Sequence, residues 1–261
     1  MMILLTGATG FIGGLVLDAL STKNVQIRCL VRKPARSDNP NISYITGDVL
    51  DLASLVKATT DVDTVYYFIH MMGEQKEQEK FDILDRKAIT NMVKACKING
   101  VKRIIHLTGM SDPHEILSHH LASRKEVEEI IRSSGINYTI FRASVIIGRG
   151  GAAFEILDTA VRSFPIIPVF NWANTRIQPI FIGDVIRYLV ECLDKKETLN
   201  KCYDICCSEV FTYEELMQEY ARMSGYKRIF IHVPGSWHWI SSFVLGKLSP
   251  INSNVVYWLI E

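Results

Sequence analysis

Short apolar runs alternate with amphipathic segments over roughly the first 145 residues of the chain. The runs hold only a few residues each and favour strands, whereas the segments between them have the spacing of helices with one apolar face. Strands that alternate with helices in this way are typical of βαβ units and a parallel sheet. The predicted strands are residues 3–5, 25–31, 42–45, 65–69, 104–107 and 138–141, and the predicted helices are residues 11–20, 52–58, 77–99 and 117–133.

The pattern changes after Gly148, where further glycines and the prolines at 165, 168 and 179 leave no immediate alternation of strand and helix. Helices are predicted again at 185–193 and 213–223, the second begun by the capping-box pair Thr212 and Glu215. A short strand is predicted at 202–206, although Asp204 is unfavourable inside a strand.

These patterns predict an α/β fold with a Rossmann-type doubly wound parallel sheet. This domain is expected over residues 1–147, with a later segment at about 178–207 returning to it. Most of residues 148–261 would form a smaller C-terminal lobe that binds a substrate or a partner. Residues 237–261 are rich in aromatic and aliphatic side chains and end inside a predicted amphipathic helix. We expect this helix to pack on the second lobe, the alternative being a membrane or partner surface, and we expect the natural chain to extend beyond Glu261.

The composition argues against several classes of function, namely binding of nucleic acid or anionic lipid through a general charge, metal binding and membrane spanning. Hydrophobic residues make up 48% of the 261 residues and charged residues 22%, which is typical of a globular protein with a large core. The 29 basic and 28 acidic residues leave a net charge of +1, so no general field attracts nucleic acid or anionic lipid. The six cysteines lack the spacing of metal ligands, so we expect reduced thiols and no metal. No run approaches the roughly 20 apolar residues that span a bilayer, which predicts a cytoplasmic protein without an integral membrane segment.

A glycine-rich turn carries the main chemical signal. Gly7, Gly10 and Gly13 follow the first predicted strand and open the first predicted helix, together with Thr9, Phe11 and Ile12. In a dinucleotide fingerprint the first glycine permits the tight turn, the second lets the pyrophosphate approach the backbone, and the third lets the helix pack on the strand. The N–H groups and the positive dipole end of the helix would hold the phosphates. The alternative is a structural turn without a ligand.

The next loops bear on the choice of cofactor. NAD-binding versions of this fold place an acidic residue after the second strand, but this chain has Arg32 and Lys33 there. Cations suit a 2′-phosphate, so the sequence favours NADP(H) over NAD(H); the alternative is two solvated basic residues. Asp48, followed by Val49, comes after the third strand, where a carboxylate would reach the adenine amino group. It would otherwise be a loop carboxylate or a helix cap.

Further segments accompany the turn TGATGFIG: GDVLD at 47–51, HLASRKEVEE from residue 120, SG at 134–135, FRA at 141–143, QPI at 178–180 and GDV at 183–185. Together they resemble the atypical short-chain dehydrogenase/reductases, and among these the NmrA-like and YbjT-like NAD(P)-binding proteins. The resemblance covers most of residues 2–195. Its motifs are specific for fold and cofactor but say little about the substrate.

The wider superfamily implies a catalytic Tyr and a Lys four residues apart on one helix. The matching positions here are His120 and Arg124, so the tyrosine is missing. Arg124 would hold ribose or phosphate, and His120, with an ordinary pKa of about 6.5, would donate a proton, unless it is only a surface or cofactor-contacting residue. The resemblance also implies that Thr108 bonds a substrate carbonyl, if it is not a strand-end cap. His70, with Met71, would line the cofactor cleft beyond the fourth strand, or be an ordinary loop residue.

Two functions are compatible with these residues. The first is an NADP-dependent oxidoreductase that acts on a small carbonyl or quinone-like substrate, with His120 or a water as proton source and Thr108 polarising the acceptor. The second is a non-catalytic NADP(H)-binding redox sensor or assembly factor with a protein partner. The loss of the Tyr/Lys pair favours the second, and whether the chain is an enzyme stays open from the sequence.

Overall fold

The computed structural model describes residues 1–71, 78–111, 117–233, 247 and 251. The chain divides into two compact units, one made of Met1–Arg142 and Gly183–Asp204, the other of Ala143–Ile182 and Ile205–Glu261. Apart from residues 247 and 251, the helix predicted at 237–261 lies outside the described residues.

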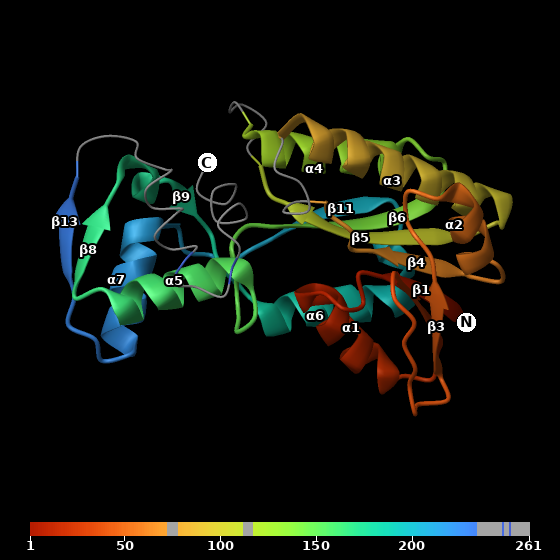
Figure 1. The fold of residues 1–261 in the computed structure, drawn as a ribbon, viewed down its shortest axis with the longest axis horizontal. Coiled ribbons are helices and arrows are strands. Elements are labelled where there is room, and N and C mark those ends of the chain that lie inside the picture. The colour runs from red at the N-terminus through yellow and green to blue at the C-terminus, as the bar shows by residue number, and fades with distance from the viewer. Residues whose placement is uncertain (72–77, 112–116, 234–246, 248–250, 252–261) are drawn as a thin grey trace. The chain divides into compact units, whose positions relative to one another are not determined.

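A seven-stranded sheet forms the first unit, in the order β11-β6-β5-β4-β1-β2-β3 (Figure 1). β1 pairs in parallel with β2 and β4, β2 with β3, and β4 with β5. The strand order reverses between β1 and β4, the place where open sheets of this kind bind ligands. The strands are β1 (Met2–Thr6), β2 (Gln26–Val31), β3 (Ile42–Thr46), β4 (Thr64–Tyr67), β5 (Arg103–Gly109), β6 (Asn137–Ala143) and β11 (Lys201–Ile205).

Helices cover both faces of this sheet, with α3 and α4 on one face and α1 and α6 on the other (Figure 1). The apolar stripe predicted for α3 is buried, and Ala88, Met92 and Cys96 are fully inaccessible. The predicted doubly wound Rossmann-type fold is therefore confirmed. The helices of this unit are α1 (Phe11–Ser21), α2 (Leu52–Ala58), α3 (Gln78–Ile98), α4 (His119–Arg132), α6 (Ile182–Glu191) and the 3₁₀ turns η2 (Cys192–Asp194) and η3 (Lys196–Thr198).

Several boundaries differ from the prediction by one to three residues, and two of these differences have a clear physical reason. The strand predicted at 65–69 ends at Tyr67, because the next N–H, that of Phe68, donates to Thr6 Oγ1 at 3.0 Å instead of continuing the ladder. The helix predicted at 185–193 begins earlier, at Ile182, with Asp184 in its first turn, where a negative charge suits the helix dipole.

The second unit corrects the prediction for the region after Gly148. Strand and helix do alternate there: α5 (Ala152–Ser163) begins directly after its N-cap Gly151, and β8 (Ile166–Val169) follows it. The prolines misled the pattern because Pro165 precedes β8 and Pro168 lies in a two-stranded sheet, where one edge needs no N–H donor. The sequence pattern alone did not reveal this.

The residues of the second unit that the structure describes form three two-stranded sheets and two main helices. The capping box predicted at Thr212 and Glu215 is present at the start of α7. Its core packs α5 against α7 and β8 through Leu157, Val161, Ile167 and Met217, among others. The remaining elements are β7 (Ile146–Ile147), η1 (Asn171–Asn174), β9 (Arg176–Ile177), β10 (Ile180–Phe181), β12 (Phe211–Thr212), α7 (Tyr213–Met223) and β13 (Ile229–His232), with pairs β7–β10, β9–β12 and β8–β13.

Candidate functional site

The glycine turn is tightly packed at two of its three glycines. Gly7 has a φ of 71°, and a Cβ there would lie 2.8 Å from the carbonyl oxygen of Phe68. A Cβ on Gly13 would lie 2.1 Å from the carbonyl oxygen of Gly7, so only glycine lets α1 approach the turn this closely. Backbone geometry thus explains both residues.

Gly10 differs from these two, because its neighbours leave more room. An added Cβ would meet only the Gly7 carbonyl oxygen, at 3.2 Å. Gly10 is exposed and is the N-cap of α1, yet no side chain caps this helix, and its first turn holds no acidic residue. Thr9 is also exposed, and Phe11 and Ile12 are half-buried. The helix therefore offers uncompensated N–H groups and a positive dipole end to an anion.

The basic and acidic candidates on the β2–β3 side lie at the surface. Arg32 and Lys33 are exposed in the loop after β2, and Arg36, which the sequence argument passed over, is exposed in the same loop. Asp48 is exposed after β3, and its Oδ1 accepts a hydrogen bond from Leu50 N at 2.8 Å, as in an Asx turn. Val49 is buried and contributes its carbonyl oxygen to Asn91 Nδ2 at 3.3 Å.

Thr6 joins the glycine turn to the segment after β4. Its hydroxyl donates to Tyr66 O at 3.1 Å and accepts from Phe68 N at 3.0 Å. Because Gly7 contacts Phe68 directly, the turn and the His70 segment are fixed to each other across two adjacent strands. A ligand that binds at the turn therefore lies on the same rigid part of the sheet as the residues that follow β4.

A buried carboxylate organises the polar groups beyond β4 and β5. Asp85, on α3, accepts from His70 Nδ1 at 2.6 Å, from Ser123 Oγ at 3.1 Å and from Met71 N at 2.9 Å. Burial by itself raises the pKa of Asp85, but the hydrogen bonds from these partners outweigh it and the pKa is lowered. Asp85 is therefore an ionised acceptor at neutral pH.

The two histidines predicted to line the site are in contact. His70 Nε2 and His120 Nδ1 lie 3.1 Å apart, and the ring centroids are 5.0 Å apart. Burial and the charge of Arg124 lower the pKa of His70 despite its bond to Asp85. Burial, Arg124 and His70 lower the pKa of His120 to about 2. Both rings are thus neutral at pH 7, which removes the ordinary imidazole pKa as a basis for proton donation by His120.

Arg124 sits among buried groups with unusual hydrogen bonding. Its Nη1 donates to Leu107 O at 3.4 Å, while its Nε, Tyr67 Oη and His106 Nε2 are buried without a hydrogen-bond partner among the described residues. Burial raises the pKa of Tyr67 and lowers that of His106 to about 4. His106 Nδ1 donates to Tyr67 O at 2.7 Å. Polar atoms left in this way are rare in protein interiors and mark positions where a function is to be sought.

Thr108 contacts α4 rather than standing free at the strand end. It is buried, and its hydroxyl donates to Arg124 O across a long 3.5 Å. The structure thus brings four predicted residues together at the ends of β4 and β5, namely His70, Thr108, His120 and Arg124.

The sequence argument missed four polar members of this cluster: Tyr67, Asp85, His106 and Ser123. A signal existed for two of them. Asp85 lies on the apolar face of α3, three residues before Ala88 and seven before Met92, and His106 interrupts the apolar strand β5. Ionisable residues inside an apolar stripe are expected to be paired or functional.

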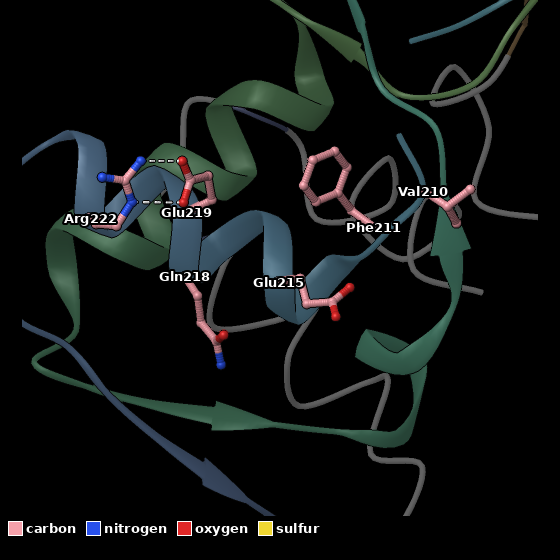
Figure 2. A pocket seen from close by; sticks show the side chains of 6 residues that line it. All are labelled: Val210, Phe211, Glu215, Gln218, Glu219 and Arg222. Atoms are coloured by element: carbon pink, nitrogen blue, oxygen red, sulfur yellow. Dashed lines mark hydrogen bonds and ion pairs between the residues drawn. The ribbon is translucent and has the colours of Figure 1, made fainter. Parts of the chain in front are cut away.

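The second unit has an open hollow of about 460 Å³ (Figure 2). Its polar residues serve local structure: Glu215 closes the capping box, and Glu219 pairs with Arg222, as the dashed lines show. Gln218 Nε2 donates to Glu214 Oε1 at 2.9 Å. Nothing in this hollow resembles the converging donors of the cluster at β4 and β5.

In ranges 1–71, 78–111 and 117–233, no three His, Cys, Asp or Glu side chains are grouped so that they could hold a metal ion. Of the helices that the structure describes, none combines the length and apolar character needed to cross a membrane.

A family profile described as NAD(P)H-binding matches residues 7–160, more than half of the chain. The chain belongs to this NAD(P)H-binding family. The match confirms the resemblance to atypical short-chain dehydrogenase/reductases and begins at the glycine turn.

The proteins that this chain resembles have names that describe different functions. The chain is 25% identical over 219 residues to the mitochondrial NADH dehydrogenase [ubiquinone] 1 alpha subcomplex subunit 9 of Dictyostelium discoideum, a match that covers 81% of this chain and 60% of that protein. It is 26% identical over 241 residues to the ceramide reductase of Caulobacter vibrioides, covering 89% and 74%. A nucleoside-diphosphate-sugar epimerase structure from Staphylococcus aureus aligns with a TM-score of 0.78 at 21% identity, over 100% of this chain and 89% of that one, which supports the fold.

The buried histidines predict acid-sensitive stability. The folded pKa values of His70, His106 and His120 lie below the roughly 6.5 of an unfolded imidazole, so the unfolded chain binds more protons as the pH falls. The contribution of the neutral histidines to the free energy of unfolding is fully present above about pH 6.5. It decreases as the pH falls below about 6.5, and for His106 it does so until the pH reaches the folded pKa of about 4. Each histidine contributes a slope of up to about 1.4 kcal/mol per pH unit in its window, measurable by urea unfolding from pH 8 to 5.

His106→Asn is the matched control for this effect. Its amide nitrogen keeps a donor near the Nδ1 position, facing Tyr67 O, but the side chain does not titrate. Between pH 6.5 and 5 the slope should fall by about 1 kcal/mol per pH unit on average, whatever the change in absolute stability. An unchanged slope would show that His106 is not held neutral in the folded protein.

Proposed function

We propose that this member of the NAD(P)H-binding family is an NADP-dependent oxidoreductase that acts on a small carbonyl or quinone-like substrate. The observation that carries the cofactor part is the exposed glycine turn at the uncapped start of α1. The reductase name of the Caulobacter relative supports the reaction class. A cytoplasmic location stays a prediction, since the Dictyostelium relative is named as mitochondrial.

The proposed site residues form two groups, one on each side of the point between β1 and β4 where the strand order reverses. The backbone N–H groups after Gly10 would hold the pyrophosphate, and Arg32 and Lys33 after β2 would hold the 2′-phosphate. Asp48 would face the adenine with the carboxylate oxygen not used by Leu50 N. His70 and the α4 residues lie beyond β4 and β5, on the opposite side of the reversal, and would therefore face the nicotinamide half.

When bound, the reduced nicotinamide supplies a hydride. Reduction of a carbonyl also consumes a proton, and neutral His120 does not carry a spare one at pH 7, so we assign the proton to water. Thr108 would polarise the acceptor oxygen only if its hydroxyl turned away from Arg124 O, a contact long enough at 3.5 Å to be given up. A catalytic role of His120 or Thr108 stays a prediction.

A second candidate is a non-catalytic NADP(H)-binding sensor or assembly factor. The specific observation in its favour is that His120 and Arg124 stand where the superfamily has Tyr and Lys, and that His120 has a pKa of only about 2. Arginine stays charged and cannot take part in proton transfer as lysine can. The subunit name of the Dictyostelium relative is compatible with such a role.

Gly10→Ala should weaken NADPH binding by about tenfold or more, about 1.4 kcal/mol, because the methyl group would stand where the phosphate approaches. The protein itself needs to give way by only a few tenths of an ångström. Gly14→Ala is the matched control, since its Cβ would make an ordinary 3.5 Å contact with Ala8 O. Calorimetry on both variants measures the difference, and equal affinities would contradict pyrophosphate binding at this turn.

Arg32→Ala should weaken NADPH binding by roughly 1 to 3 kcal/mol while leaving NADH binding unchanged, because only NADPH carries the 2′-phosphate. Lys57→Ala removes an exposed charge from the last turn of α2 and should affect neither. Fluorescence titration with both dinucleotides gives the ratio. The same loss for NADH would remove the assignment of Arg32 to the 2′-phosphate.

The wild-type chain should oxidise NADPH in the presence of at least one member of a panel of quinones and aldehydes. At subsaturating NADPH, Gly10→Ala should lower kcat/KM by about the tenfold lost in binding. The loss of NADPH absorbance measures both. If the protein binds NADPH but turns over no member of the panel, the proposed oxidoreductase function is wrong and the non-catalytic sensor or assembly factor is the better proposal.

A further inference from the structure

The cluster beyond β4 contains a chain of three hydrogen-bonded groups that runs from a buried carboxylate to the helix position of the missing tyrosine. Asp85 Oδ2 lies 2.6 Å from His70 Nδ1, and His70 Nε2 lies 3.1 Å from His120 Nδ1. His70 thus uses both of its ring nitrogens within the chain, and His120 uses only its Nδ1. The order of these atoms decides where the protons are.

An ionised carboxylate only accepts, so His70 Nδ1 must carry a proton and donate it to Asp85. In a neutral ring the other nitrogen then has none, so His70 Nε2 accepts from His120 Nδ1. His120 is neutral as well, which leaves its Nε2 without a proton. The chain therefore selects one tautomer of His120, with Nε2 as an acceptor.

The charged groups around the chain are consistent with this arrangement. Burial, and after it the charge of Arg124 on the same helix as His120, lower the pKa of both histidines, which keeps them neutral. His106, on β5, donates from its Nδ1 to Tyr67 O and is itself neutral at pH 7. Tyr67, on β4, stays protonated because burial raises its pKa. None of these neighbours supplies a second carboxylate that would reverse the direction of the hydrogen bonds from His120 through His70 to Asp85.

We propose that Asp85 and His70 are positioning residues that hold His120 in the Nδ1–H tautomer, so that His120 Nε2 accepts a hydrogen bond from a donor on the nicotinamide half of the dinucleotide. Such donors are the ribose hydroxyls and the carboxamide N–H. The part that concerns the tautomer rests on the chain of contacts and on the neutrality of the two buried histidines, whereas the part that concerns the ligand rests on the cofactor binding proposed above. The chain orients a ligand at this position and does not protonate it.

An isosteric change at Asp85 should invert the whole chain. Asp85 Oδ1 accepts from Met71 N, a backbone donor that needs an acceptor, at 2.9 Å. In Asp85→Asn the amide oxygen keeps this place, and the NH₂ group takes the place of Oδ2 next to His70 Nδ1 and Ser123 Oγ. The amide then donates to His70, which passes its proton to Nε2 and donates to His120 Nδ1. His120 then carries its proton on Nε2, as a donor.

Nitrogen NMR on protein labelled in its histidines tests the tautomer in the ligand-free chain, with His120→Gln to assign the signal. We expect an unprotonated Nε2 on wild-type His120 at pH 7 and a protonated Nε2 in Asp85→Asn. Ser123→Ala, which removes a donor to Asp85 but leaves the His70 bond, should keep the wild-type tautomer. A protonated Nε2 in the wild type overturns the proposal, also where Asp85→Asn fails to fold. A folded Asp85→Asn with the wild-type tautomer overturns it as well.

NADPH is then added to the same wild-type sample, and calorimetry follows its binding in parallel. The signal of His120 Nε2 should shift when NADPH binds, as expected for a nitrogen that receives a hydrogen bond. Binding without this shift overturns the assignment of the donor to the nicotinamide half. Absence of binding overturns the proposed function instead, and the tautomer measured before the addition is independent of that result.

Discussion

The carboxylate of Asp85 is the constraint on which the polar edge of the sheet depends. It accepts from a side chain and a backbone N–H that follow β4, and from Ser123 on α4, so a single residue of α3 joins three segments. A carboxylate buried to this degree is costly without such donors, since an unpaired charge loses its hydration. Because two of the donors come from adjacent residues after β4 and the third from α4, Asp85 fixes the orientation of the His70 ring, and the ring of His120 is placed by its contact with His70.

The glycine turn and this edge belong to one rigid assembly. Thr6 bonds to the backbone on both sides of Tyr67, and Gly7 lies against Phe68 so closely that no side chain fits between them. The end of β1 and the end of β4 are therefore locked together at the reversal of strand order. The N–H groups proposed to bind the pyrophosphate and the histidine chain thus lie in the same unit and are joined by these contacts.

The sequence predicted what depends on local pattern and missed what depends on long-range contacts. The strands of the sheet, the helix after the glycine turn and the capping box at Thr212 follow from periodicity and capping chemistry, and the structure confirms them. The early end of β4 could not be predicted, since it depends on a bond from Phe68 N to a side chain 62 residues away. The partnership of Asp85 with His70 escaped for the same reason, although a carboxylate on the buried face of α3 marked that residue as unusual. The glycines and prolines after Gly148 made α5 hard to predict from the sequence pattern. They are tolerated because Gly151 stands at the N-cap of α5 and Pro168 lies in a two-stranded sheet.

Replacing a Tyr/Lys pair by His120 and Arg124 changes the electrostatics of the edge rather than merely removing an acid. Burial is the main cause of the lowered pKa values of His70, His106 and His120, and the charge of the buried guanidinium lowers each of them further. With the histidines neutral and the carboxylate ionised, every proton in the chain has a defined position at physiological pH. Such an edge discriminates ligands by the direction of their hydrogen bonds, which is a property of recognition. For the proposed function this means that the chemistry would come from the bound dinucleotide, while the histidine chain would hold it in one orientation.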